Sequence, residues 1–83
     1  MSNKTERTDL TNLALKEWGT VVEILAERGE VWPNTDCTRW GPGLTRAMDR
    51  SQTLTEACAI IGADDARDLG RLSDLYDRIH GRL

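Results

Sequence analysis

The side chains best suited to metal binding or nucleophilic catalysis are few in this sequence and far apart. Cys37, Cys58 and the single histidine, His80, are the only thiol and imidazole groups. A zinc site needs about four ligands at close spacing, and the chain contains neither a CxxC nor an HxxxH pair. We therefore expect two free thiols, no metal site and no cofactor.

Paired carboxylates are the other feature that could do chemistry. Asp64 and Asp65 are adjacent, but neighbouring residues on a helix point in different directions. Acid–base catalysis also requires a pocket that separates two carboxyl pKa values, and a small helical domain rarely encloses one. No glycine-rich loop is followed by Lys-Ser or Lys-Thr to hold a phosphate. The sequence thus predicts no catalytic residues, and we expect a protein that is not an enzyme.

Size and charge narrow the class of protein. The 83 residues carry 14 acidic and 11 basic side chains, with a net charge of −3, and 39% of them are hydrophobic. One small domain is expected, and its limited core leaves homo-oligomerisation open. The polar start and the short apolar runs do not resemble a secretion signal or a membrane span. We therefore expect a cytoplasmic protein.

The first helix is expected to begin at Thr8 or Asp9 and to continue to about Arg28, with Gly29 as its stop. Residues 1–8 would form a flexible tail and residues 9–83 a single helical domain. The apolar stripe of this helix includes Leu13 and is wider than one packing face, so two sides should be covered, by the rest of the fold or by a partner. Gly19 is costly within a helix and predicts the close approach of another backbone or ring.

Residues 30–44 contain two prolines and two glycines, which exclude a long regular element. A short helical turn could begin here at Thr35 or Asp36. Trp32 and Trp40 lie in this segment and allow two interpretations. They can fold back over a core that lacks phenylalanine, or they can form an exposed Trp–Arg binding surface with Arg39.

The remaining helices are predicted from caps and periodicity. Residues 44–50 should form a short helix, and a second should run from Thr53, in a capping box with Glu56, to the stop at Gly62. The last should start at Asp64 and bury a stripe made of Leu69, Leu72, Tyr76, Ile79 and Leu83. The predicted fold is all-α: a small single-domain bundle of three to five helices with one irregular segment rich in Trp, Pro and Gly.

The stretch from Thr53 to Leu72 resembles the helix-turn-helix family over about a quarter of the chain. Gly62 matches the glycine that ends the first helix in that family, and Cys58 matches the small residue four positions earlier. The family's apolar positions six and nine residues after the glycine are here Asp68 and Arg71. The apolar residues stand one position later, which predicts a rotated second helix or a longer turn.

Charge argues against the DNA-binding role that this resemblance implies. Asp64, Asp65 and Asp68 would lead the recognition helix and repel phosphates, and the chain as a whole is acidic. Our main hypothesis is a non-catalytic protein that binds a partner protein, as small acidic inhibitors or adaptors of phages and mobile elements do. Its acidic surface could occupy a basic nucleic-acid-binding groove of the target. The alternative is a helix-turn-helix DNA-binding regulator. The predicted partner-binding residues are Trp32, Arg39, Trp40, Arg46, Asp64, Asp65 and Asp68.

Overall fold

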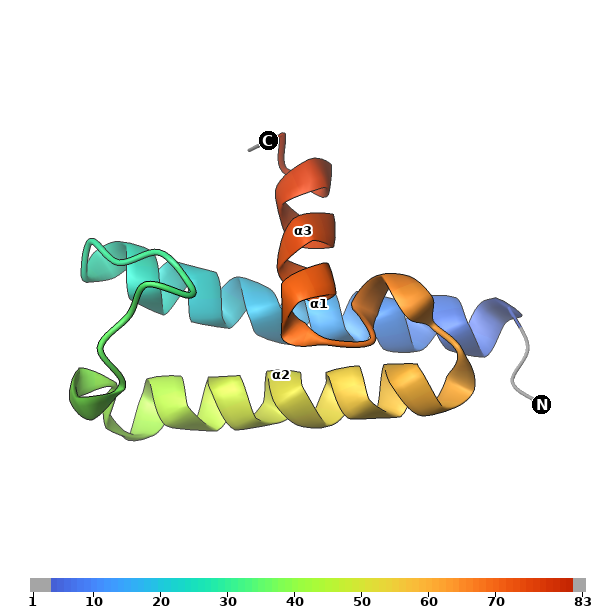
Figure 1. Cartoon of the computed structure of the whole chain (residues 1–83), viewed down its shortest axis with the longest axis horizontal. Helices are drawn as coiled ribbons and strands as arrows, with labels where there is room; N and C mark the ends of the chain where they lie inside the picture. Colours follow the sequence, from blue (N-terminus) through green and yellow to red (C-terminus); the bar gives the residue numbers. More distant parts are fainter. Residues whose placement is uncertain (1–3, 82–83) are drawn as a thin grey trace.

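The computed structural model describes residues 4–81 and contains three α-helices and two short 3-10 helices in that range. Their order is α1 (Lys4–Glu27), η1 (Cys37–Arg39), α2 (Gly41–Ile61), η2 (Asp64–Ala66) and α3 (Leu69–Ile79). Helices α1 and α2 lie side by side and antiparallel, and α3 crosses them (Figure 1). The all-α prediction is therefore confirmed.

Helix α1 begins at Lys4, so the predicted start at Thr8 or Asp9 is too late. The proposed tail, residues 1–8, lies partly outside the described residues, and its part from Lys4 onwards belongs to α1. Gly29 has the left-handed φ of 70° expected of a helix stop. The buried positions of α1 recur at helical spacing and face the other helices: Ala14, Trp18, Val21 and Leu25.

Helix α2 is continuous from Gly41 to Ile61, and the two separate helices predicted within it are wrong. Thr53 is not an N-cap, because one buried stripe runs through the supposed break and keeps the backbone helical. Ser51 occupies that stripe with no exposed surface, and its hydroxyl donates to the Ala47 carbonyl at 3.0 Å. A buried hydroxyl satisfied within its own helix gives no reason for the chain to turn. The stop at Gly62 is confirmed, with a left-handed φ of 82°.

The predicted start of the last helix at Asp64 is also wrong. Asp64 opens the short helix η2, and Asp68 is the N-cap of α3, accepting a hydrogen bond from the Arg71 N–H at 2.8 Å. The short helix η2 therefore lengthens the turn between α2 and α3, which is one of the two outcomes that the displaced apolar positions predicted. Leu72 and Tyr76 are buried as predicted, Ile79 is largely exposed, and Leu83 lies outside the described residues.

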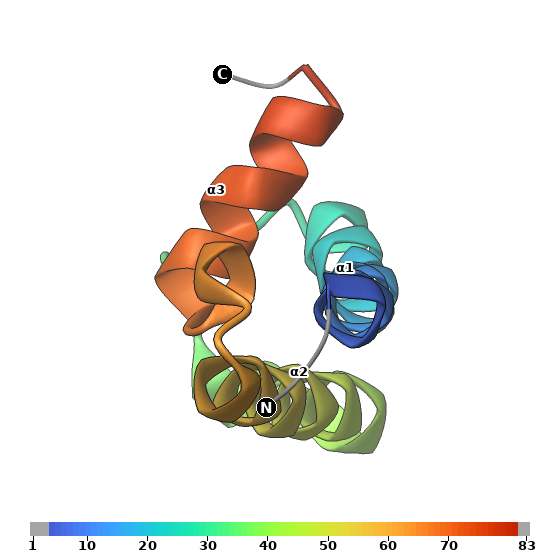
Figure 2. The ribbon, with the colours of Figure 1, turned by 90° about the vertical axis from the view of Figure 1, so that its right-hand side faces the viewer.

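The view along the long helices shows α3 leaning against one side of the α1–α2 pair (Figure 2). Tyr76 brings α3 against Gly19, because a Cβ added at Gly19 would lie 3.6 Å from the Tyr76 ring. The predicted approach of a ring is confirmed, but 3.6 Å is an ordinary contact distance. The space at this position therefore accommodates a methyl group.

We predict that Gly19→Ala raises the free energy of unfolding by about 0.5–1 kcal/mol, since alanine restores helix propensity without a clash. Gly62→Ala is the matched comparison. Gly62→Ala should lower the free energy of unfolding by about 1–2 kcal/mol. The backbone of Gly62 is left-handed, a conformation that a residue with a Cβ disfavours even where the space around it is open. Urea unfolding followed by circular dichroism measures both. Equal effects of the two variants would contradict this assignment.

The two candidate caps can also be separated by mutation. Asp68→Ala should cost about 1 kcal/mol of unfolding free energy, because it removes the acceptor for the Arg71 N–H. Asp64→Ala should change stability by less than about 0.5 kcal/mol, as expected of an exposed residue that is not a cap. Thermal unfolding of both variants at neutral pH tests the difference, and a larger loss for Asp64→Ala would refute it.

Candidate functional site

The residues predicted to bind a partner fall into two separate groups. Trp32, Arg39 and Trp40 lie in the connection between α1 and α2, and Arg46 follows in the second turn of α2. The three aspartates lie in the connection between α2 and α3, at the opposite end of the helix pair (Figure 1). The fold therefore does not unite all seven residues in one surface.

Hydrogen bonds within the chain hold the connection between α1 and α2 in place. The Arg28 guanidinium donates to the carbonyl oxygens of Arg39 and Trp40 at 2.8 and 2.7 Å. The Glu30 carboxylate accepts from the Asp36 N–H at 2.9 Å. These bonds link the start of the connection to its end. They hold the backbone that carries Trp32 and Trp40 in one conformation.

The two tryptophans fold back against the core, as the first of the two interpretations predicted. Trp32 and Trp40 are half-buried and pack against the core, while Arg39 is exposed. The Trp32 ring meets the buried Trp18 ring edge to face, with centroids 5.3 Å apart and planes at 85°. The Trp40 indole N–H donates to the Thr35 hydroxyl at 2.8 Å, which satisfies its polar edge.

The short helix η1 begins as the sequence indicated, with Asp36 as its cap. The Asp36 carboxylate accepts from both the hydroxyl and the N–H of Thr38, at 2.6 and 3.1 Å. These bonds stabilise the charged form and lower the pKa of Asp36 below its ordinary value, with a smaller contribution from Arg39.

The three predicted aspartates are exposed, and one of them also has a structural role. Asp68 uses a carboxylate oxygen to cap α3. Asp65 borders a small hollow together with Arg71, Asp74 and Arg78, so positive and negative side chains alternate there. This mixture of signs weakens the hypothesis that an acidic surface of the last helix occupies a basic groove.

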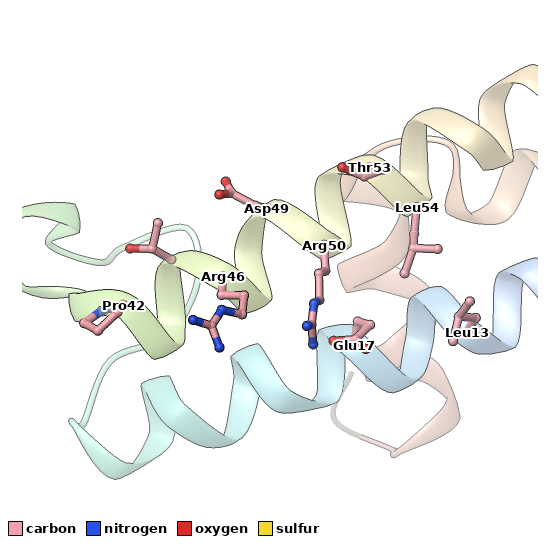
Figure 3. A pocket seen from close by; sticks show the side chains of 9 residues that line it. Leu13, Glu17, Pro42, Arg46, Asp49, Arg50, Thr53 and Leu54 are labelled. Atoms are coloured by element: carbon pink, nitrogen blue, oxygen red, sulfur yellow. The ribbon is translucent and has the colours of Figure 1, made fainter.

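A hollow of about 680 Å³ lies between α1 and α2 (Figure 3). We call it the α1–α2 groove. None of its lining residues comes from α3, which instead contacts α1 at Gly19. Arg46 is the only predicted site residue in it. The groove is lined by Leu13, Glu17, Pro42, Thr45, Arg46, Asp49, Arg50, Thr53 and Leu54.

Apolar contact area and charge are combined in this groove. Leu13 is 46% exposed, although its place in the stripe of α1 suggested burial. Leu54 lies opposite it on α2, and Arg46 and Arg50 extend from α2 towards α1, where Glu17 faces Arg50 (Figure 3). The sequence analysis did not assign Leu13 or Leu54 to a site. The unusual width of the apolar stripe was the signal that one side would remain uncovered.

The groups that could do chemistry are dispersed in the structure. Cys58 is buried, and this burial raises the pKa of its thiol, against a smaller opposing effect of the Thr11 hydroxyl. Cys37 is exposed, and the His80 ring stacks on Tyr76 at the end of α3. Within residues 4–81, no three His, Cys, Asp or Glu side chains are grouped as metal ligands. No helix in this range has the length and hydrophobicity needed to cross a bilayer.

Comparison of the chain with protein-family models, curated proteins and solved structures gave no match.

The pKa of Asp36 gives a test of the loop geometry. Because its folded pKa is lowered, Asp36 contributes stability that is present above its unfolded pKa, about 3.9, and is lost as the pH falls through the folded value. Thr38→Ala removes the hydroxyl donor and should raise the pKa of Asp36 towards its ordinary value. Carboxyl chemical shifts followed by NMR during an acid titration measure this. An unchanged Asp36 titration in Thr38→Ala would contradict the assignment.

Proposed function

We propose that this protein is a non-catalytic binding module, of inhibitor or adaptor type, that binds a partner protein through the α1–α2 groove. The observation that carries the proposal is the partly exposed Leu13, which lies opposite Leu54 in a groove bordered by Arg46 and Arg50. Apolar anchors next to arginine are the composition that most often dominates binding energy at protein interfaces.

The shape of the groove favours an amphipathic helix as the element that binds in it. Two antiparallel helices form its walls, and a third helix can lie between them with its apolar face inward. Arg46 and Arg50 would pair with carboxylates on the margin of that helix, and Glu17 and Asp49 would favour one orientation of the partner.

The proposal predicts that groove variants lose the partner while the fold is retained. Leu13→Asp should weaken binding by about tenfold or more, because it places a charge in the apolar centre of the contact. Leu13 is already 46% exposed, so its replacement should have little effect on thermal unfolding. The experiment is capture of partners from the native host by tagged wild-type and variant protein, with mass spectrometry of what is retained.

Ile60→Asp is the matched control, since Ile60 is an apolar residue of the same helix pair, 83% exposed and outside the groove. Partners lost with Leu13→Asp and kept with Ile60→Asp would support the groove. Equal retention by both variants would refute it. Retention of the protein on a non-specific DNA duplex at low salt, lost on adding salt, would instead favour the DNA-binding alternative.

A further inference from the structure

A second hollow, about 280 Å³ in volume, lies between α1, the connection that follows it and α3. We call it the Trp pocket. Trp18 and Val22 contribute to it from α1, Trp32 and Glu30 from the connection, and Asp77 from α3. It shares no lining residue with the α1–α2 groove. Its volume is at the lower end of the range for ligand pockets, which favours a small molecule or a single side chain.

One indole ring of this pocket is accessible and rests on a second, buried one. Trp18 and Trp32 stand nearly perpendicular, at 85°, with centroids 5.3 Å apart. Trp18 is only 1% exposed, so the ring that a ligand can reach is that of the half-buried Trp32. The face of an indole carries negative electrostatic potential and attracts a cation.

The charge around the pocket has one sign. Glu30 and Asp77 are the charged residues among those described as lining it, and both are half-buried carboxylates. Glu30 already accepts a hydrogen bond from the Asp36 N–H, which holds its side chain in position. The nearby Arg28 is bound to the carbonyl oxygens of Arg39 and Trp40. A ligand in the pocket therefore meets two carboxylates and the Trp32 ring.

From this arrangement we propose that the Trp pocket binds an organic cation that carries a methylated ammonium group. The methyl groups would pack against Trp32 and Val22, and the positive charge would be balanced by Glu30 and Asp77. A bare metal ion does not fit this lining, because hard cations need several oxygen ligands. A neutral apolar ligand would leave both carboxylates without a counter-charge as it excludes water from them.

The first experiment compares ligands of equal shape and different charge. Choline is titrated into ¹⁵N-labelled protein, and the three indole N–H signals are followed by NMR. The Trp32 signal should shift and saturate, while Trp40, which lies outside the pocket, should not. The neutral isostere 3,3-dimethylbutan-1-ol should bind about tenfold more weakly, since it lacks the charge. Equal binding of both compounds, or no shift with any methylated ammonium probe, would overturn the proposal.

The same titration distinguishes two sources of the methylated ammonium group. A peptide with trimethyllysine is compared with choline and with the same peptide carrying unmodified lysine. Tighter binding of the methylated peptide would identify a partner's side chain as the source, and tighter binding of choline would identify a small molecule. Either result supports the proposal, whereas preference for unmodified lysine would refute it.

The second experiment uses variants of α3 that change charge equally. Asp77→Asn removes a pocket carboxylate and should weaken choline binding by about tenfold. Asp74→Asn is the matched control, because Asp74 lies on the same helix and borders a different hollow, with Asp65, Arg71 and Arg78. Asp74→Asn should leave the affinity unchanged. Equal weakening by both variants would show only a general charge effect and would overturn the assignment. Because neither variant alters the α1–α2 groove, the outcome is independent of the partner-capture experiment.

Discussion

Burial of Trp18 is the interaction on which the arrangement of this protein depends. The chain has no phenylalanine, and Trp18 is the largest of its fully buried side chains. The Trp32 ring packs against it, and on the next residue, Gly19, the Tyr76 ring of α3 makes contact. The middle of α1 is therefore where the loop and the last helix both attach. A small core built around one large aromatic side chain explains how so short a chain orders a long connection.

This attachment makes the molecule one-sided. The loop and α3 cover the flank of α1 that carries Trp18, Gly19 and Val22, while the flank that carries Leu13 and Glu17 faces only α2. The uncovered flank forms the α1–α2 groove, and the covered flank forms the Trp pocket. The two hollows thus have different chemistry. Trp18 and Trp32 line the pocket on one side, whereas no aromatic side chain is among the described residues that line the groove on the other.

The local signals in the sequence were read correctly where one residue decides the backbone. Gly29 and Gly62 stop their helices, and Asp36 caps η1, because left-handed φ and a short acceptor side chain act within a single turn. The predictions were wrong at Thr53 and Asp64. Both are residue types that often cap helices, but neither is the N-cap of an α-helix in the structure. A continuous buried stripe kept α2 helical through Thr53, and the extra turn of η2 moved the cap of the last helix to Asp68. Where several residues are equally suited by type to cap a helix, the packing of the helices decides which of them does so.

The sequence by itself determined the helical class, the helix stops, the burial of Leu72 and Tyr76 in α3 and the dispersal of thiols and imidazole along the chain. Only the tertiary structure decided which apolar residues remain exposed, and so placed Leu13 in a groove and Trp32 against Trp18. The tertiary structure also places the predicted site residues at opposite ends of the helix pair. Arg46 is the one among them that borders the α1–α2 groove. The physical reason is that periodicity shows which residues share a face of a helix, while burial depends on which other helix covers that face.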